Sequence, residues 1–346
     1  MNSQHNPAAT SRRRALQLFG GFAAASPAIP RSLSAMVGAL APETEAATPA
    51  FQAVAYNHIS YNTRDYAASR DFYAKLLGMK VVYDNGKQCS LEFGSPVNAL
   101  YIRNLKTPDD KARVDHFCFS IPNFDSQAVL AKLRSRNIEP KPDGHYSWAF
   151  PDPNAFNIHV TAEHGVYPGQ NAPNAPADYT GPIPPQPVGA DKAPFKAVAV
   201  SCLTVRTADV AVSRDFYLSL FGMRKVYEDS LQCFLAFGPS DNHLCLRKLD
   251  PGDTKPYVES FKFTTPNFIQ HEVESELVSL SVVPEPDTRL AVTMLDPDGF
   301  RFGIAQRGLP EYIGTTCHGD AAKCPTTNPH AEPSTGPRTT NSSNSK

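Results

Sequence analysis

The 346-residue sequence lacks three features that would assign it to a common functional class. It has no basic excess, because 33 Lys and Arg stand against 34 Asp and Glu for a net charge of −1, and this disfavours nucleic-acid binding. It has no uninterrupted apolar run of the roughly 18–20 residues that a membrane-spanning helix needs. Its seven cysteines form no CxxC pair, which excludes zinc ribbons and thioredoxin-like redox sites. The remaining expectation is a globular protein whose partner is a small molecule.

The N-terminus is predicted to be an export signal. Arg12, Arg13 and Arg14 precede the short apolar stretch 18–25, a pattern that resembles a twin-arginine signal. Residues 1–41 are therefore expected to be a signal and flexible N-terminus that direct the protein to the periplasm. The cleavage position stays open, since Pro42 follows the small-x-small sequence 39–41. The alternative is a basic, disordered N-terminus.

The middle of the chain contains one pattern twice, at a constant offset of 144 residues. A match without gaps indicates two homologous domains, 53–163 and 195–308. Residues 164–194 hold eight prolines and are predicted to be an extended linker, whereas residues 310–346 are predicted to be a disordered tail. The repeated words include Ser69-Arg70-Asp71-Phe72-Tyr73 with Ser213-Arg214-Asp215-Phe216-Tyr217, Gly78-Met79 with Gly222-Met223, and Asp152-Pro153 with Asp296-Pro297.

Each domain is itself predicted to be double, because a strand, a helix and three strands follow one another twice. Apolar residues such as Phe72, Tyr73, Leu76 and Leu77 share one helix face, and Gly78 ends that helix. Each domain is therefore two βαβββ units, and the fold class is α+β. In the first domain the expected elements are strand 57–61, helix 64–77, strands 80–83, 89–93 and 99–103, strand 114–121, helix 126–136, and strands 138–141, 146–150 and 156–161.

Two motifs carry a family resemblance. The pattern R-D-F-Y-x-x-L-x-G-M over residues 70–79, and Asp-Pro-Asp-Gly-Phe over residues 296–300 before a final strand, resemble the vicinal oxygen chelate superfamily. This superfamily includes glyoxalase I, extradiol dioxygenases, and fosfomycin and bleomycin resistance proteins. The resemblance implies two tandem domains, each a cup-shaped mixed sheet, with a metal ion on a concave face.

The resemblance also implies a set of metal ligands, because the family takes them from the first and last strands of each unit. These positions hold His58, His116 and His159, the last where the family usually has glutamate. Imidazole suits Fe, Mn, Zn, Cu or Ni, so the expected cofactor is a divalent metal of open identity. Three neutral ligands would leave its +2 charge uncompensated and favour anionic partners. The alternative is three ordinary, half-buried strand histidines.

Two further residues are candidate catalytic groups. Tyr101 takes the fourth ligand position, and it is interpreted as a weak ligand, a hydrogen-bond donor to substrate or a core residue. His145 begins a strand and either orients a ligand or substrate or is an exposed turn residue. In the strand that follows, Tyr146, Trp148 and Phe150 share one face, which either lines the cup or packs under the helices.

The second domain is predicted to have lost the metal site and to be structural. His58, His116, His159 and Tyr101 correspond to Cys202, Ser260, Gly303 and Cys245. Buried cysteines usually behave as small apolar residues. Two alternatives stay open: a soft-metal site of Cys202, His243 and Cys245, and a disulfide between Cys202 and Cys245, which the family geometry would bring close. Cys317 and Cys324 in the tail form a further candidate pair.

Three functions remain. The first is a metal-dependent enzyme acting on a small oxygen-bearing substrate, as an oxygenase of the extradiol type or, as a second choice, a glyoxalase-like lyase or isomerase. The second is a binding protein that sequesters a ligand or metal, as resistance proteins of this family do. The third is an exported structural module with a vestigial site.

Overall fold

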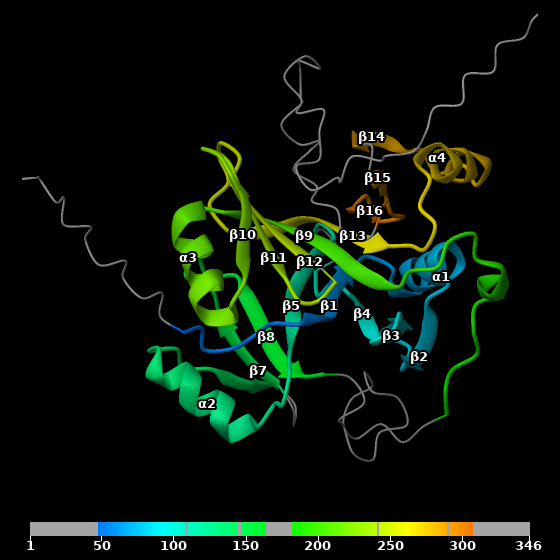
Figure 1. The fold of residues 1–346 in the computed structure, drawn as a ribbon. Helices are drawn as coiled ribbons and strands as arrows, with labels where there is room; N and C mark the ends of the chain where they lie inside the picture. Colours follow the sequence, from blue (N-terminus) through cyan, green and yellow to red (C-terminus); the bar gives the residue numbers. More distant parts are fainter. Residues whose placement is uncertain are drawn as a thin grey trace, which may run out of the picture. The chain divides into compact units, whose positions relative to one another are not determined.

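The computed structural model describes residues 48–107, 110–143, 147–163, 182–240, 242–288 and 291–306 (Figure 1). The expected export signal, the tail with Cys317 and Cys324, most of the proline-rich segment 164–194 and His145 lie outside these ranges. Within them, no helix is long and apolar enough to cross a membrane.

The first half of the described chain forms one eight-stranded sheet, here sheet A, in the order β2-β3-β4-β1-β5-β8-β7-β6. β1 pairs parallel with β4 and antiparallel with β5, so the two βαβββ units meet at the β1–β5 pair. Its elements are β1 Ala55–Thr63, α1 Tyr66–Leu77, β2 Lys80–Asp84, β3 Gln88–Phe93, β4 Asn98–Asn104, β5 Arg113–Ile121, α2 Ser126–Ser135, β6 Lys141–Asp143, β7 Ser147–Pro151 and β8 Asn157–Ala162.

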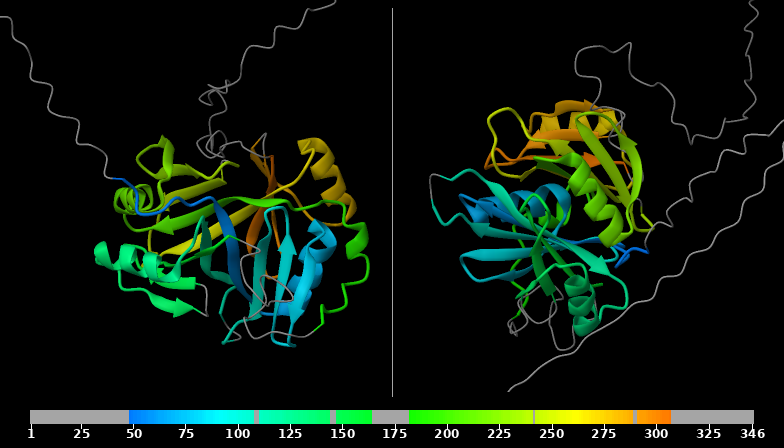
Figure 2. Two further views of the ribbon diagram at one scale, coloured as in Figure 1. Left: turned by 60° about the horizontal axis from the view of Figure 1, so that its bottom comes forward. Right: turned by 90° about the vertical axis from the view of Figure 1, so that its left-hand side faces the viewer.

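The second half repeats this topology as sheet B, in the order β10-β11-β12-β9-β13-β16-β15-β14. Figure 2 shows the strands of sheet A, blue to green, beside those of sheet B, light green to orange. The predicted α+β class with tandem domains of paired βαβββ units is confirmed. The elements are β9 Ala199–Thr207, α3 Val210–Phe221, β10 Arg224–Glu228, β11 Gln232–Phe237, β12 Asn242–Lys248, β13 Tyr257–Thr264, α4 Gln270–Ser279, β14 Glu285–Thr288, β15 Ala291–Leu295 and β16 Arg301–Ala305, after a short 3-10 helix η1 at Ala190–Lys192.

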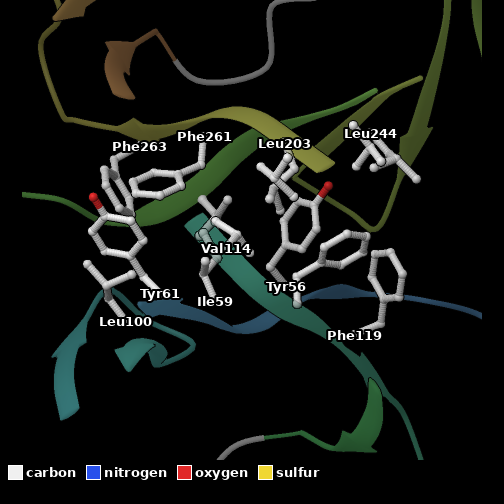
Figure 3. Packing of buried hydrophobic residues seen from close by; sticks show 14 of the residues in the cluster. Tyr56, Ile59, Tyr61, Leu100, Val114, Phe119, Leu203, Leu244, Phe261 and Phe263 are labelled. Carbon is white, nitrogen blue, oxygen red and sulfur yellow. The ribbon is translucent and has the colours of Figure 1, made fainter. Parts of the chain in front are cut away.

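Each sheet has a core face and an outer face. Side chains alternate along a strand, so Ile59 and Tyr61 of β1 and Leu100 of β4 enter the core, together with residues of sheet B such as Phe261 (Figure 3). The residues between them, including Ser60 and Tyr101, lie on the outer face. The helices pack on the core face, where burial of their apolar side chains stabilises them more than helix propensity does.

The packing of the two sheets follows the repeat. The Tyr73 hydroxyl of α1 donates to Asp296 Oδ2 at 3.0 Å, and its counterpart Tyr217 of α3 donates to Asp152 Oδ2 at 3.3 Å. Gly94 and Gly238 lie where a Cβ would come within 2.0 Å of a backbone oxygen of the other sheet. Equivalent residues of the two sheets thus make equivalent contacts with the opposite sheet.

Three local details differ from the expected elements. Helix α1 begins at Tyr66 rather than residue 64, because the Asp65 side chain caps it by accepting from two backbone N–H groups. β6 begins at Lys141 rather than residue 138, because the Ile138 N–H donates back to Leu133 O and is not available to a strand. In the segment expected as a linker, the Gln186 side chain forms two 2.8 Å hydrogen bonds with the backbone of Val81 at the edge of sheet A.

Candidate metal centre

Three histidines meet on the outer face of sheet A. They come from the neighbouring strands β1, β5 and β8, and one ring nitrogen from each lies within 4.8 Å of the others. The Nε2 atoms of His58 and His116 are 3.2 Å apart, and the rings of His116 and His159 stack at a centroid distance of 3.8 Å. The side chains are buried rather than half-buried, with exposed fractions of 6%, 7% and 3%.

An acceptor stands behind the Nδ1 atom of each histidine. His58 Nδ1 lies 3.0 Å from Asn57 Oδ1, and His116 Nδ1 lies 2.8 Å from Asp115 Oδ2. His159 Nδ1 is 3.1 Å from Asp143 Oδ2, an ion-pair distance at an angle that does not make a hydrogen bond. For His58 and His116, acceptors at Nδ1 hold the ring so that Nε2 stays available as a ligand. His159 differs, because its Nε2 atom lies 3.1 Å from Asn157 Nδ2, so this contact would have to give way before Nε2 could bind a metal.

The protonation states suit metal binding. Burial lowers the pKa of His116 to about 4, although the hydrogen bond to Asp115 acts in the opposite direction, so this imidazole is neutral at pH 7. The hydrogen bond from His116 lowers the pKa of Asp115, and the close contact with the His159 ring lowers the pKa of Asp143. Carboxylates therefore stand behind two of the three rings, those of His116 and His159. The expectation of an uncompensated +2 charge was wrong, because the negative charge lies behind the ligands rather than among them.

The donor set of the cluster fits a divalent ion. Three imidazole nitrogens that lie this close together suit Fe, Mn, Zn, Cu or Ni. Among the described residues, this is the one group of three or more His, Cys, Asp or Glu side chains with such spacing. The alternative set in sheet B, Cys202, His243 and Cys245, does not form one.

Of the two candidate catalytic residues, the structure places one. The Tyr101 ring on β4 stands edge-on to the His58 ring, with centroids 4.7 Å apart, so it borders the cluster. His145 lies outside the described residues. In the strand after it, Phe150 belongs to the core and the Trp148 Nε1–H donates to Ser126 O of α2 at 3.0 Å. These two residues therefore pack under the helices and do not line the site.

A polar group beside Tyr101 was missed by the sequence analysis. Ser60 and Ser90 flank Tyr101 in the register of the sheet, and Asn62 flanks Arg103. Buried polar atoms of these four neighbours of Tyr101, namely Ser60 Oγ, Ser90 Oγ, Asn62 Oδ1 and Arg103 Nε, have no hydrogen-bond partner in the described part of the chain. The sequence shows that each of these residues lies at an outward position of its strand. It does not show which strands are neighbours, and the pairing of β1, β4 and β3 is what brings the residues together.

In sheet B the corresponding positions are filled differently. Cys202 and Cys245 pack with Phe234 in a small apolar cluster, and both are thiols, so the alternative of a disulfide between them was wrong. Lys262 is buried on the same face, and its side chain runs within 3.1 Å of the place that a Cβ on Gly303 would take. The site is thus replaced by apolar packing and one lysine.

Comparisons with known proteins agree with the fold. Residues 55–154 match the family model described as the Glyoxalase/Bleomycin resistance protein/Dioxygenase superfamily, which confirms the resemblance expected from the sequence. No curated protein sequence matches the chain.

Solved structures of the same architecture include several enzymes. The 2,3-dioxygenase LapB from Pseudomonas sp. KL28 is 15% identical with a TM-score of 0.57, over 76% of this chain and 96% of that one. A Mn(II)-bound glyoxalase from Novosphingobium aromaticivorans is 15% identical with a TM-score of 0.54, over 74% and 83%. Homoprotocatechuate 2,3-dioxygenase from Brevibacterium fuscum, in a complex with 3,4-dihydroxyphenylacetate, is 16% identical with a TM-score of 0.54, over 78% and 86%. At these identities the likeness concerns the fold.

Proposed function

We propose that the protein is a metal-dependent oxygenase of the extradiol type, acting on a small substrate with vicinal oxygen atoms. The observation that carries this proposal is the convergence of His58, His116 and His159, with an acceptor behind each Nδ1. The fold is shared with 2,3-dioxygenases, and this sharing supports the choice of reaction class.

The residues of the site would have three different roles. The three histidines hold the ion, which, when bound, supplies a Lewis acid that polarises substrate oxygens. Asp115 and Asp143 orient two of the rings and balance part of the charge. Tyr101 is placed to contact a substrate bound beside His58.

A glyoxalase-like isomerase is the second candidate, favoured by the shared fold with the Mn(II)-bound glyoxalase. Such an enzyme needs a carboxylate base at the metal. Asp115 and Asp143 already face Nδ1 atoms, and no carboxylate takes part in the three-histidine group. The geometry therefore favours the oxygenase.

The test begins with metal content. Protein purified without a histidine tag should hold one divalent ion per chain, and His58→Ala should lose it, whereas Cys202→Ala at the matching position of sheet B should keep it. The Fe- or Mn-loaded protein should then consume one O2 per catechol-type substrate, with both oxygen atoms recovered in the product. Metal binding without oxygen uptake, together with isomerisation of a hemithioacetal, would select the glyoxalase instead. Metal binding without any turnover would leave a sequestering protein.

We also propose export to the periplasm, on the ground of the arginines at 12–14 before an apolar stretch. Changing all three to lysine keeps the charge and removes the residues that the twin-arginine receptor reads. Fractionation should then find the variant in the cytoplasm. A periplasmic product from this variant would contradict the proposal.

A further inference from the structure

The side chain of Arg103, beside the candidate metal centre, has no partner among the described residues. Arg103 follows Tyr101 by two residues on β4, on the outer face, between Asn62 of β1 and Gln88 of β3. Its side chain makes no ion pair and no hydrogen bond with any described residue, and its Nε atom is buried. A buried donor without an acceptor is costly, so this arrangement calls for an explanation.

The repeat provides the comparison. Arg247 occupies the same position in sheet B, and there it is fully engaged: Nη1 lies 3.1 Å from Glu259 Oε2, and Nε donates to Gln232 Oε1 at 3.2 Å. The counterpart of Glu259 in sheet A is Asp115. Asp115 faces His116 Nδ1 at 2.8 Å instead, so the acid that neutralises the arginine in sheet B orients a histidine in sheet A.

The residues around Arg103 offer buried polar atoms that a polar ligand could bind. Ser60, Ser90 and Asn62 each bury an oxygen that has no partner among the described residues, and all three lie on the outer face near Tyr101. In sheet B the position of Ser90 holds Phe234, which packs into the apolar cluster. At the position of Asn62, sheet B has Arg206, which is paired with Glu259 and Asp250. Sheet A therefore keeps unsatisfied polar atoms where sheet B has apolar packing at Phe234 and an ion-paired arginine at residue 206.

Arg103 is also near enough to act on the cluster through its charge. After the hydrogen bond from His116, which is the largest cause, the charge of Arg103 is among those that lower the pKa of Asp115. A ligand held by Arg103 would thus lie close to groups bound at the histidines.

We propose that Arg103 binds a carboxylate of the substrate, so that the substrate is an anionic compound with its vicinal oxygens toward the histidines; this rests on the proposed function. The guanidinium presents parallel N–H donors that match the two oxygens of a carboxylate. One arginine balances one negative charge, and the hydroxyls of Ser60 and Ser90 add neutral hydrogen bonds. Arg103 is then a specificity-determining residue rather than a metal ligand.

The experiment compares ligands that differ in one carboxylate. Catechol, 3,4-dihydroxybenzoate and its one-carbon-longer homologue 3,4-dihydroxyphenylacetate are titrated without oxygen into the metal-loaded protein by calorimetry. One of the two acids should bind about 10- to 100-fold more tightly than catechol, as expected for a charge-assisted hydrogen bond. Arg103→Gln should abolish that preference while leaving the metal content and the affinity for catechol unchanged. Arg103→Lys, which keeps the charge without the fork, should retain part of it.

The matched control is Arg247→Gln in sheet B, which should leave the preference intact. A wild-type protein without preference for either acid, or an Arg103→Gln protein that keeps it, would overturn the proposal. So would a loss of metal in both Arg103 variants, since Arg103 would then support the metal site and not the substrate. Benzoate, which has no vicinal hydroxyls, separates the two hypotheses. If catechol does not bind, the oxygenase proposal fails, and Arg103 is still judged by whether benzoate binds the wild-type protein and not Arg103→Gln.

Discussion

Sheets A and B share a framework and differ on their outer faces. Helices α1 and α3 begin at capping aspartates, Asp65 and Asp209, and end at left-handed glycines, Gly78 and Gly222. The core faces of both sheets carry the same alternation of large apolar residues. The outer faces differ: the three histidines of sheet A correspond in sheet B to Cys202, which belongs to a small apolar cluster, Ser260 and Gly303. The side chain of Lys262 is buried beside Gly303.

The difference shows how one position can serve two purposes. Asp115 and Glu259 are equivalent in the repeat, yet the first holds His116 and the second joins Arg206 and Arg247. Packing constrains the core faces because each loss of a buried contact destabilises both sheets. The outer faces have no such constraint, so they diverged while the fold stayed the same.

The largest expected effect tests the shared framework. Gly94→Ala and Gly238→Ala should each destabilise the protein by about 4 kcal/mol or more, because the new Cβ would meet a backbone oxygen at 2.0 Å and φ is positive at both residues. Gly86→Ala is the control, since φ is +81° there but nothing lies within 4 Å, and about 1 kcal/mol is expected. Denaturant titrations measure all three. A small effect at either Gly94 or Gly238 would show that the two halves of the interface are not equivalent.

The next prediction concerns the two carboxylates behind the histidines. Asp115→Asn and Asp143→Asn should each weaken metal binding about 10- to 100-fold, because the amide oxygen can still accept but the compensating negative charge behind the ring is lost. Competition with a chelator of known affinity gives the constants. Glu259→Gln, at the position of Asp115 in sheet B, should leave the metal affinity unchanged. Equal affinity in all three variants would remove the assigned role of these carboxylates.

Much of this architecture was predictable from the sequence, for identifiable reasons. The repeat fixed the number of units, Gly78 fixed a helix end, and the placement of His58, His116 and His159 on strands followed from the family resemblance. The role of Asp143 was missed because β6 was expected at 138–141, which leaves Asp143 outside the strand. In the structure β6 begins three residues later and includes Asp143, whose carboxylate reaches His159. Arg103 escaped because a missing partner is visible only once the strands are paired.

A smaller effect is expected at the two tyrosine–aspartate hydrogen bonds between the sheets, which occupy equivalent positions but should differ in the cost of their loss. Among the described residues, Tyr217 is the one whose side chain donates to Asp152 Oδ2, so we expect Tyr217→Phe to cost about 2 kcal/mol. Tyr73→Phe should cost about 1 kcal/mol, because Asp296 Oδ2 keeps its 2.6 Å hydrogen bond from Tyr61, which has no equivalent in sheet B. Chemical denaturation of both variants gives the difference, and a larger loss for Tyr73→Phe would contradict the reasoning.

The smallest effect concerns pH and distinguishes the two equivalent acids. Burial acts to raise the pKa of Glu259, but the hydrogen bond from Arg206 and the charges of Arg206 and Arg247 lower it below its ordinary value. The unfolded chain then binds more protons in the window between the folded and the ordinary pKa. The stabilisation is therefore fully present above the ordinary value near 4.5 and is lost as the pH falls through the depressed value.

Glu259→Gln should remove this contribution. At pH 7 the variant should be less stable than the wild-type protein by about 1 kcal/mol, since the ion pairs are partly open to solvent. The difference should shrink as the pH is lowered below the ordinary pKa of the carboxyl, because the wild-type side chain is then protonated as well. Denaturant titrations of metal-free protein across this range measure it. A difference that stays constant with pH would mean that Glu259 stabilises sheet B by packing and hydrogen bonding rather than by its charge.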